Sequence, residues 1–326
     1  MILRFLPLAA FALVACASDD LGVRRMAEPQ KASPVLARAA AERGDWNQSA
    51  SVWYELALRG GDGAPAAYVQ CALALCAAGA PANAQRLLER ALEARPDQIE
   101  LLEGLADVML RSGFRRAAEP HLERVLELDP DRVATLLELA RLRFELGLEV
   151  GAAPLLERRI ALGGGDAETW VLLARARRGA GDAAGAVEAY QRALELGESD
   201  PERLLHAAAL YFEFPADARG ALDAALAERW IARAIELDPA SVDGHFLLGV
   251  LHESEQRVDA AGAEYRRALE LDPNAPKVLK RIAEFYRRRG DRELALAAGA
   301  RSVDVVRRSD GDVVAAERWL AGLARE

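Results

Sequence analysis

The octapeptide RALELDPN at residues 267–274 decides the fold, because three close variants of it occur earlier in the chain. These variants are RALEARPD at 90–97, RVLELDPD at 124–131 and RAIELDPA at 233–240. Each consists mostly of strong helix formers and has a proline as its seventh residue. Proline disfavours the helical conformation in the residue before it, so the helix is expected to end there. The prolines of the first two copies lie 34 residues apart, as do those of the last two. The sequence therefore predicts a helical unit repeated every 34 residues.

A regular frame extends these copies over most of the chain. The distance between the second and third prolines is 109 residues, which is three units of 34 plus seven. Eight units then fill residues 31–309, and the sixth, 201–241, carries the seven extra residues. The predicted units begin at residues 31, 65, 99, 133, 167, 201, 242 and 276. Because such a unit cannot bury its apolar face alone, we expect neighbouring units to stack.

Composition favours an all-α class. The chain of 326 residues is 52% hydrophobic and 29% charged but only 6% aromatic, and Ala, Leu, Arg and Glu fill nearly every stretch. These residues favour helices, and the β-branched runs that strands need are missing. The net charge of −9 argues against a general nucleic-acid binder, because neutralising phosphates needs a basic surface.

The residues inside each unit resemble the tetratricopeptide repeat (TPR). That family places a large residue at position 4, Leu at 7, a small residue at 8, a Tyr-like residue at 11, Ala at 20, an aromatic at 24, Ala at 27 and Pro at 32. The fifth unit supplies Trp170, Leu173, Ala174, Ala186, Tyr190 and Ala193. The seventh supplies Leu248, Gly249, Ala261, Tyr265, Ala268 and Pro273. The resemblance implies an all-α, right-handed α-solenoid of about eight helix pairs.

The boundaries of the helices can be anticipated at several points. Glycines between the paired helices are expected to adopt the left-handed conformation that ends the first helix. They are Gly79, Gly113, Gly147, Gly181 and Gly290. In the sixth unit, seven residues nearly equal two helical turns, so its second helix is expected to begin early, near Ala216. A looser junction is expected at 163–165, where three glycines replace the usual Asp-Pro.

Residues 310–326 are predicted to form a capping helix. Asp310 or Asp312 is the expected N-cap of this helix. Its inner side is expected to comprise Val314, Trp319, Leu320 and Leu323.

The N-terminus is typical of an export signal. Arg4 precedes an apolar run that ends at Ala15, too short to span a bilayer. The sequence Leu-Val-Ala-Cys ending at Cys16 resembles the lipobox of bacterial lipoproteins, which implies a signal peptide over 1–15 and lipidation of Cys16. Ala-Cys-Ala also fits ordinary secretory cleavage, which would release a soluble periplasmic protein. Residues 16–30 are expected to be a flexible tether.

No constellation of residues predicts catalysis, a cofactor or a metal site. His245 and His252 lie seven apart on one predicted helix, a rise of about 10 Å, which is too far to share one ion. They occupy packing positions 4 and 11. Cys71 and Cys76 would have Cα atoms about 8–9 Å apart, beyond the reach of a disulfide, and Cys71 is expected in the core. We therefore expect a binding protein rather than an enzyme.

The candidate site is a second stripe on each first helix, at repeat positions 2, 5, 9, 12 and 13, here called the groove stripe. In the TPR family this stripe lines the concave surface that holds peptides or partner helices, so the resemblance implies protein or peptide partners. The candidate residues are Glu103, Asp107, Arg141, Phe144, Arg175, Arg178, Phe212, Phe246, Lys277, Lys280 and Arg287. The alternative is that these charges only solvate the faces of a helical protein rich in Arg and Glu.

These observations lead to a functional hypothesis. The general form resembles the TPR lipoproteins of pilus biogenesis, outer-membrane protein assembly and polysaccharide export. We expect an adaptor anchored in the cell envelope, on the outer membrane facing the periplasm, because Ala17 rather than aspartate follows Cys16. The alternative is a regulatory subunit that positions a murein hydrolase or a protease. The sequence does not identify the partner or the oligomeric state.

Overall fold

The structure of the chain is a computed structural model that describes residues 21–309 and 312–325. Within these residues it contains seventeen α-helices, two short 3-10 helices and no strand, so the predicted all-α class is confirmed. The chain divides into two compact units, one ending at Gly165 and the other beginning at Asp166. The boundary coincides with the glycine-rich junction predicted at 163–165.

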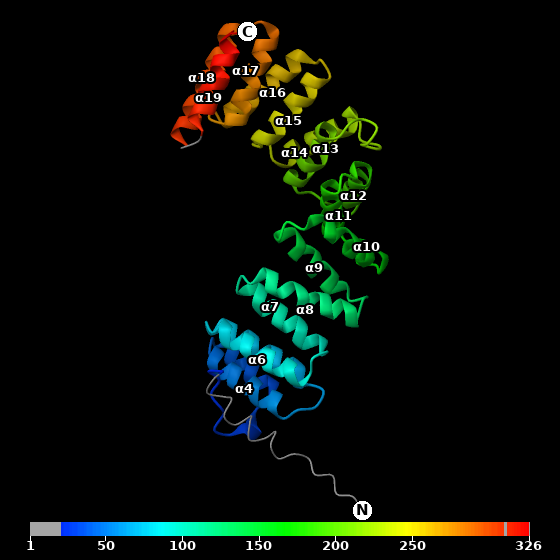
Figure 1. Cartoon of the computed structure of the whole chain (residues 1–326), viewed down its shortest axis with the longest axis vertical. Coiled ribbons are helices and arrows are strands. Elements are labelled where there is room, and N and C mark those ends of the chain that lie inside the picture. Colours follow the sequence, from blue (N-terminus) through cyan, green and yellow to red (C-terminus); the bar gives the residue numbers. More distant parts are fainter. Residues whose placement is uncertain (1–20, 310–311, 326) are drawn as a thin grey trace, which may run out of the picture. The chain divides into compact units, whose positions relative to one another are not determined.

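The first unit is built from antiparallel helix pairs, which can be followed in Figure 1 from blue to green. Its helices are α3 (Pro34–Glu42), α4 (Trp46–Leu58), α5 (Ala64–Ala77), α6 (Pro81–Ala94), α7 (Ile99–Arg111), α8 (Arg115–Leu128), α9 (Val133–Glu145) and α10 (Ala153–Ala161). Two 3-10 helices, η1 (Pro29–Lys31) and η2 (Glu149–Ala152), precede α3 and α10. Each pair lies within one predicted 34-residue unit.

The second unit continues the same pattern. Its helices are α11 (Ala167–Gly179), α12 (Ala183–Glu195), α13 (Pro201–Glu213), α14 (Ala224–Leu237), α15 (Val242–Ser254), α16 (Val258–Leu271), α17 (Pro276–Arg289), α18 (Arg292–Arg308) and α19 (Val313–Arg325). Aspartate N-caps start several of them; Asp166, for example, accepts a hydrogen bond of 2.8 Å from the backbone N–H of Thr169. The predicted turn glycines have φ between 73° and 82°, as a left-handed C-cap requires.

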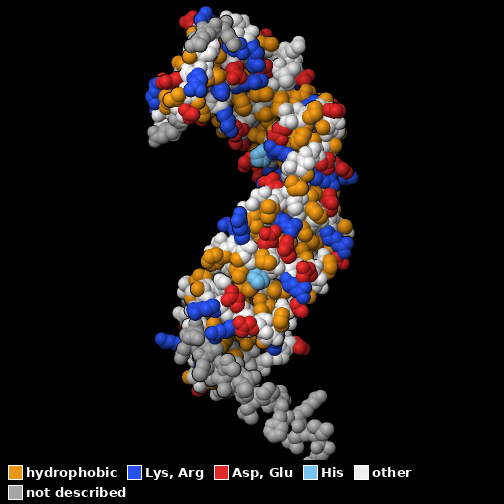
Figure 2. Space-filling model, viewed as in Figure 1, with side chains coloured by type: hydrophobic (Ala, Val, Ile, Leu, Met, Phe, Trp, Pro, Cys, Tyr) orange, Lys and Arg blue, Asp and Glu red, His pale blue; other side chains and the backbone are white. Residues whose placement is uncertain are grey.

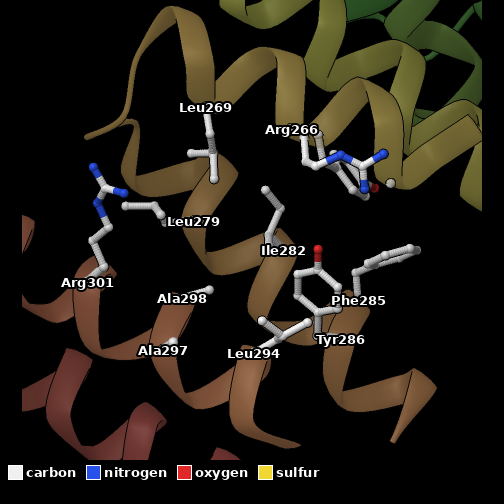
Figure 3. A pocket seen from close by; sticks show the side chains of 12 residues that line it. Arg266, Leu269, Leu279, Ile282, Phe285, Tyr286, Leu294, Ala297, Ala298 and Arg301 are labelled. Atoms are coloured by element: carbon white, nitrogen blue, oxygen red, sulfur yellow. The ribbon is translucent and has the colours of Figure 1, made fainter. Parts of the chain in front are cut away.

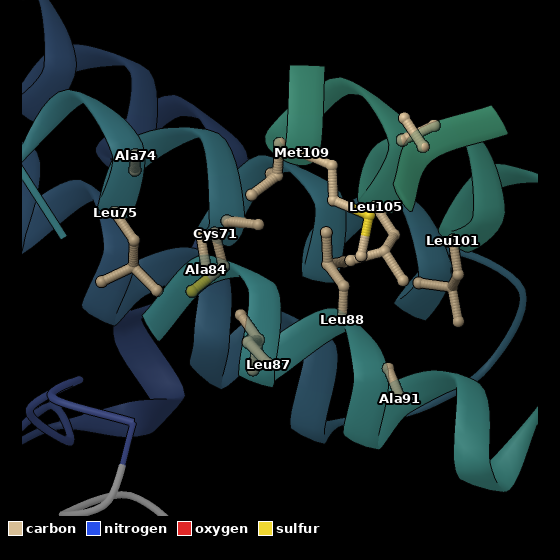
Figure 4. Close-up of a cluster of buried hydrophobic side chains, with 14 of the residues drawn as sticks. Cys71, Ala74, Leu75, Ala84, Leu87, Leu88, Ala91, Leu101, Leu105 and Met109 are labelled. Carbon is tan, nitrogen blue, oxygen red and sulfur yellow. The ribbon is translucent and has the colours of Figure 1, made fainter. Parts of the chain in front are cut away.

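The core of the first unit lies between successive helix pairs. Leu75 from α5, Leu88 from α6 and Leu105 from α7 meet in one buried cluster, shown in Figure 4. Cys71 lies in the same cluster, as predicted, and its thiol donates to the carbonyl of Ala50 at 3.3 Å. Burial raises the pKa of Cys71, which makes it an inert apolar residue. Cys71 and Cys76 are both free thiols.

A cluster of aromatic rings forms much of the core of the second unit. The ring of Tyr265 on α16 lies 6.2 Å from that of Phe246 on α15 and 5.4 Å from that of Phe285 on α17. Gly249 makes room for it, since a Cβ there would come within 2.6 Å of the Tyr265 ring. The small residue at position 8 and the aromatic at position 24 are therefore one packing unit, as the repeat pattern requires.

The two histidines fill packing positions, as predicted. His252 is buried, and burial lowers its pKa. His245 Nδ1 lies 2.7 Å from Glu264 Oε2 on the paired helix. Within the described part of the chain, no group of three or more His, Cys, Asp or Glu side chains is arranged to hold a metal ion.

The insertion in the sixth unit differs from the prediction. Helix α14 begins at Ala224, capped by Asp223, and not near Ala216. The extra residues lengthen the loop between α13 and α14. Arg219 holds this loop against α13, because its guanidinium stacks 4.0 Å from the centre of the Tyr211 ring and donates to the Tyr211 carbonyl at 2.7 Å. Two extra helical turns would project without packing, whereas the loop folds back on its own repeat.

The N-terminal segment also differs from the prediction over its described part. Leu21 and Val23, which fall within the expected tether of 16–30, are buried against the first helix pairs. Arg25 pairs with Glu55 on α4, whose side chain is only 3% exposed. The expected signal peptide 1–15 and the lipidated Cys16 lie outside the described residues. No helix of the described residues combines the length and apolarity needed to cross a membrane.

The capping helix α19 follows the prediction with one exception. Asp312 Oδ1 accepts from the Ala315 N–H at 2.9 Å and caps the helix, and Leu323 is buried. Val314 was expected on the inner side, but it is 65% exposed. Gly299 stands where the repeat usually has an aromatic, because a Cβ there would lie 2.8 Å from Leu320 of α19. The capping helix thus occupies the space that the missing ring would fill.

Candidate functional site

The groove stripe of the second unit begins with an ion pair between consecutive first helices. Arg178 Nη2 on α11 lies 2.5 Å from Glu213 Oε1 on α13. The two residues occupy position 12 of one repeat and position 13 of the next. Arg178, predicted to contact a partner, therefore joins two repeats of the chain itself.

The same relation recurs between α15 and α17. Glu253, at position 12 of the seventh repeat, accepts from Arg288 at position 13 of the eighth. It also accepts from the Tyr265 hydroxyl at 2.6 Å and from Arg281 Nε at 3.0 Å. Glu253 and Arg288 occupy stripe positions, but the candidate residues included neither of them, and Arg281 at position 6 lies outside the stripe. The pairing of Glu253 with Arg288 could have been found from the opposite charge of residues 35 apart, one repeat plus one residue.

Phe212 lies on the part of the stripe that comes from α13. Its side chain is 36% exposed, and its ring meets Tyr211 edge to face with centroids 5.1 Å apart. The hydroxyl of Tyr211 donates to Glu255 at 2.8 Å, which fixes the position of both rings. Phe246 is partly buried, because it packs against Tyr265 at the edge of the core. Of these two predicted anchors, Phe212 is the more exposed.

Basic residues form the end of the stripe on α17. Lys277, Lys280 and Arg287 are exposed, as is Arg175 on α11. The ammonium of Lys280 lies 5.4 Å from the centre of the Trp319 ring on α19, within the range of a cation–π contact. Figure 2 shows Lys and Arg side chains gathered over the C-terminal helices.

The groove residues of the first unit are mostly engaged within the chain. Glu103 on α7 accepts from Arg132 Nε at 2.5 Å and from Thr135 Oγ1 at 2.7 Å, both at the start of α9. Asp107 accepts from Arg111 Nε at 2.8 Å, one turn along the same helix. Arg141 is exposed and Phe144 is half-buried. Carboxylates and arginines here serve mainly to join α7 to α9 and to stabilise α7.

The titratable groups with large pKa shifts are packing residues. Burial raises the pKa of Tyr190 to about 12, and its hydroxyl has no hydrogen-bond partner among the described residues. Burial, followed by the hydrogen bond to Glu253, raises the pKa of Tyr265. Burial also raises the pKa of Glu138 on α9, with Asp107 adding to the effect. Burial is the largest cause of each of these shifts. What the stripe offers is charged and apolar contact.

Comparisons with known proteins agree with this geometry. Family models described as tetratricopeptide repeat match residues 103–167 and 207–276, and a second such model matches 167–199. A TPR repeat-containing protein from Cytophaga hutchinsonii is 16% identical, with a TM-score of 0.57 over 74% of this chain and 96% of that structure. YrrB, described as a TPR protein with an unusual peptide-binding site, is 17% identical, with a TM-score of 0.51 over 59% of this chain and 95% of its own. No curated protein matches the chain in sequence.

The matched segments carry the helix pairs from α7 to α16 with few interruptions. Together they cover just over half of the sequence, and the packing of small and aromatic positions seen around Tyr265 has the form that the repeat pattern requires. Proteins of this fold hold peptide or protein partners in a groove, so the chain is a scaffold for protein–protein interactions. It belongs to the tetratricopeptide repeat family.

Proposed function

We propose that this protein is a lipid-anchored adaptor of the bacterial cell envelope, in which the groove stripe of residues 166–309 holds a segment of a partner protein. The observation that carries the partner-binding role is the exposed Phe212 on α13 with exposed basic residues on α11 and α17 of the same unit. An apolar anchor with cations on either side along the stripe suits an acidic or amphipathic segment. The peptide-binding site named for YrrB supports a peptide ligand, although that likeness concerns the fold.

The internal ion pairs explain how the stripe would serve this role. The Arg178–Glu213 and Glu253–Arg288 pairs join successive first helices, so the groove surface is held in place before a partner arrives. A pre-organised surface loses less conformational entropy on binding. Phe212 is adjacent in sequence to Glu213 of the first pair, and its edge-to-face contact with Tyr211 orients its ring. We assign partner contact to Phe212 and Lys277, and a positioning role to the paired residues.

Replacing Lys277 with Glu and Phe212 with Ala in one variant should weaken partner capture by about tenfold or more, because one charge contact and one apolar anchor are lost. The measurement is the recovery of proteins that the wild-type chain captures from a membrane extract, quantified by mass spectrometry. Arg229→Glu with Leu237→Ala is the matched control, since both residues are exposed on the second helix α14. Equal recovery by the stripe variant and the control would remove the groove stripe from the proposal.

The envelope location rests on the lipobox-like sequence that ends at Cys16. Cys16→Ser should release the protein from the membrane fraction and abolish incorporation of labelled fatty acid, because serine lacks the thiol that accepts lipid. Fractionation of cells that express each form is the measurement, and Cys76→Ser serves as the control cysteine variant. A Cys16→Ser protein that stays in the membrane fraction and keeps its label would contradict the anchor. The outer membrane is the proposed site, because Ala17 follows Cys16.

A further inference from the structure

A pocket of about 260 Å³ lies between α16, α17 and α18, away from the groove stripe. Its lining is apolar and includes Leu269, Ile282, Leu294 and Ala298. Leu294 is 50% exposed, so an apolar surface is open to solvent here. The volume lies just below the range of about 300–1,000 Å³ for small-molecule sites, and it suits one or two inserted side chains.

Small residues on α18 create this space. Ala297 and Ala298 face the pocket, and Gly262 on α16 also lines it. Figure 3 shows Ala297, Ala298 and Leu294 along α18, opposite Ile282 of α17. The pocket therefore lies between the second helix of the seventh repeat and the two helices of the eighth, where these small side chains leave space.

Two arginines, Arg266 from α16 and Arg301 from α18, lie on opposite sides of the apolar lining in Figure 3. Both are exposed, and within residues 21–309 and 312–325 neither forms an ion pair or a hydrogen bond. Most arginines among the described residues have such partners, and of those that lack one, Arg266 and Arg301 are the two that line this pocket. An apolar cavity with unpaired cations at its edges is complementary to an apolar group flanked by anions.

The repeat pattern shows why Arg301 lacks a partner. Arginine recurs at position 26 of the repeat, and there Arg124 and Arg158 pair with an aspartate at position 33 of the preceding unit. The equivalent of those aspartates for Arg301 is Asn274, which is neutral. Other members of the series pair with a glutamate three residues later, as Arg192 does. For Arg301 that residue is Asp304, which pairs with Arg307 at 2.9 Å.

Arg266 also departs from the repeat pattern, because it is a basic residue where several other repeats have an acidic one. It stands at position 25, where the second, third and fourth repeats have a glutamate. These glutamates are Glu89, Glu123 and Glu157. The seventh repeat therefore lacks an acidic residue at position 33, where Asn274 stands, and at position 25, where Arg266 stands. The chain as a whole is acidic, with a net charge of −9, so the change is local and is not a general excess of basic residues.

We propose that the pocket between α16, α17 and α18 binds a short acidic peptide segment of a partner protein. One bulky apolar side chain of the peptide enters the space above Ala297 and Ala298, and carboxylates on either side of it pair with Arg266 and Arg301. The site is formed by the second helices α16 and α18 together with α17, and its lining residues lie outside the groove stripe. It would therefore bind a peptide independently of the stripe.

The test begins with a random heptapeptide library displayed on phage and selected on the full chain with Cys16→Ser. Selection should enrich peptides with Leu, Phe or Trp flanked by Asp or Glu. The affinity of one enriched, fluorescein-labelled peptide is then measured by anisotropy. Arg266→Glu with Arg301→Glu should weaken it by about tenfold or more, and Ala297→Leu should do the same by filling the pocket while leaving both charges in place. Raising the salt to 0.5 M should weaken the wild-type complex as well.

Arg229→Glu with Arg308→Glu is the matched control, because it makes the same change of net charge at exposed arginines that do not line the pocket. Its affinity should equal that of the wild type. Unfolding curves show that each variant is folded. The proposal is overturned if the enriched peptides lack acidic residues, if the pocket variants bind as the wild type does, or if the control loses as much affinity as they do. Loss of binding only in the Lys277→Glu, Phe212→Ala variant would assign the peptide to the groove stripe instead.

Discussion

Tyr265→Ala is expected to lower the free energy of unfolding of the second unit by about 3–5 kcal/mol, the range for removing a large buried aromatic. The side chain is fully buried on α16 and contacts rings on both α15 and α17. Gly249 has no side chain to move into the space that the ring would leave. Because the lost contacts join the seventh repeat to the eighth, the cavity weakens packing within a repeat and between repeats.

Tyr265→Phe is the control for this prediction. It keeps the ring and removes only the hydroxyl that donates to Glu253, so it should cost about 1 kcal/mol. Glu253 keeps Arg281 and Arg288 as partners in that variant. Urea unfolding gives the total change, and hydrogen exchange localises it, because repeat arrays can lose cooperativity. An alanine variant within 1 kcal/mol of the wild type would mean that the aromatic cluster does not hold these repeats together.

Arg25→Ala is expected to destabilise the first unit by about 2–3 kcal/mol. Arg25 donates to Glu55 through Nε at 2.5 Å and Nη2 at 3.0 Å, and the Met26 N–H also donates to that carboxylate at 3.2 Å. Removing one member of a buried pair costs about 3–5 kcal/mol, because the other charge is left buried. Arg25 itself is 41% exposed, so water can reach the site and the expected loss is smaller.

Arg24→Ala provides the matched control, since Arg24 is exposed and has no partner among the described residues. It should change the stability by less than about 0.5 kcal/mol. The double variant Arg25→Ala, Glu55→Gln should recover part of the loss, because it removes the unpaired charge. Urea unfolding and the hydrogen exchange of residues 21–31 measure these effects. Equal stability of the Arg25 and Arg24 variants would mean that the segment does not depend on this pair.

The buried position of Leu21 bears on the proposed anchor. If Cys16 carries the lipid, only the residues between Cys16 and Leu21 separate it from the first packed side chain. The first helix pairs would then lie close to the membrane surface, and a long flexible tether would not be available. If the Arg25→Ala change loosens residues 21–31, it would also lengthen the flexible connection between the proposed anchor and the folded body.

The positions of most helices could be predicted because their signals are local. Each turn glycine and proline acts on residues only a few positions away, so the repeat spacing places most turns between helices, although not the start of α14. Gln256 marks the limit of this reasoning. It takes the left-handed conformation with φ of 60° at the position where other repeats have glycine, and the helix ends there all the same. The structure predicted for the insertion after Glu213 was wrong. Seven extra residues can form either two helical turns or a longer loop, and their number does not distinguish the two.

The candidate site could be predicted only in outline. The repeat frame places Phe212 and Phe246 at comparable stripe positions, yet Phe212 is exposed and Phe246 is partly buried against Tyr265. Likewise Arg178 was predicted to contact a partner, but it pairs with Glu213. Exposure and pairing depend on side chains from the paired helix or from the next repeat, and helical spacing within one helix does not specify those contacts.

The 34-residue repeat, the all-α class and the buried small and aromatic positions were determined by the sequence alone, because helix propensity, capping and the periodic burial of one face are short-range effects. The tertiary structure decided which charges pair across repeats and that residues 21–31 pack on α4. It also decided that a pocket with two unpaired arginines opens between α16, α17 and α18. These features arise where helices distant in the chain meet. Their energies depend on distances between side chains that only the packed chain brings together.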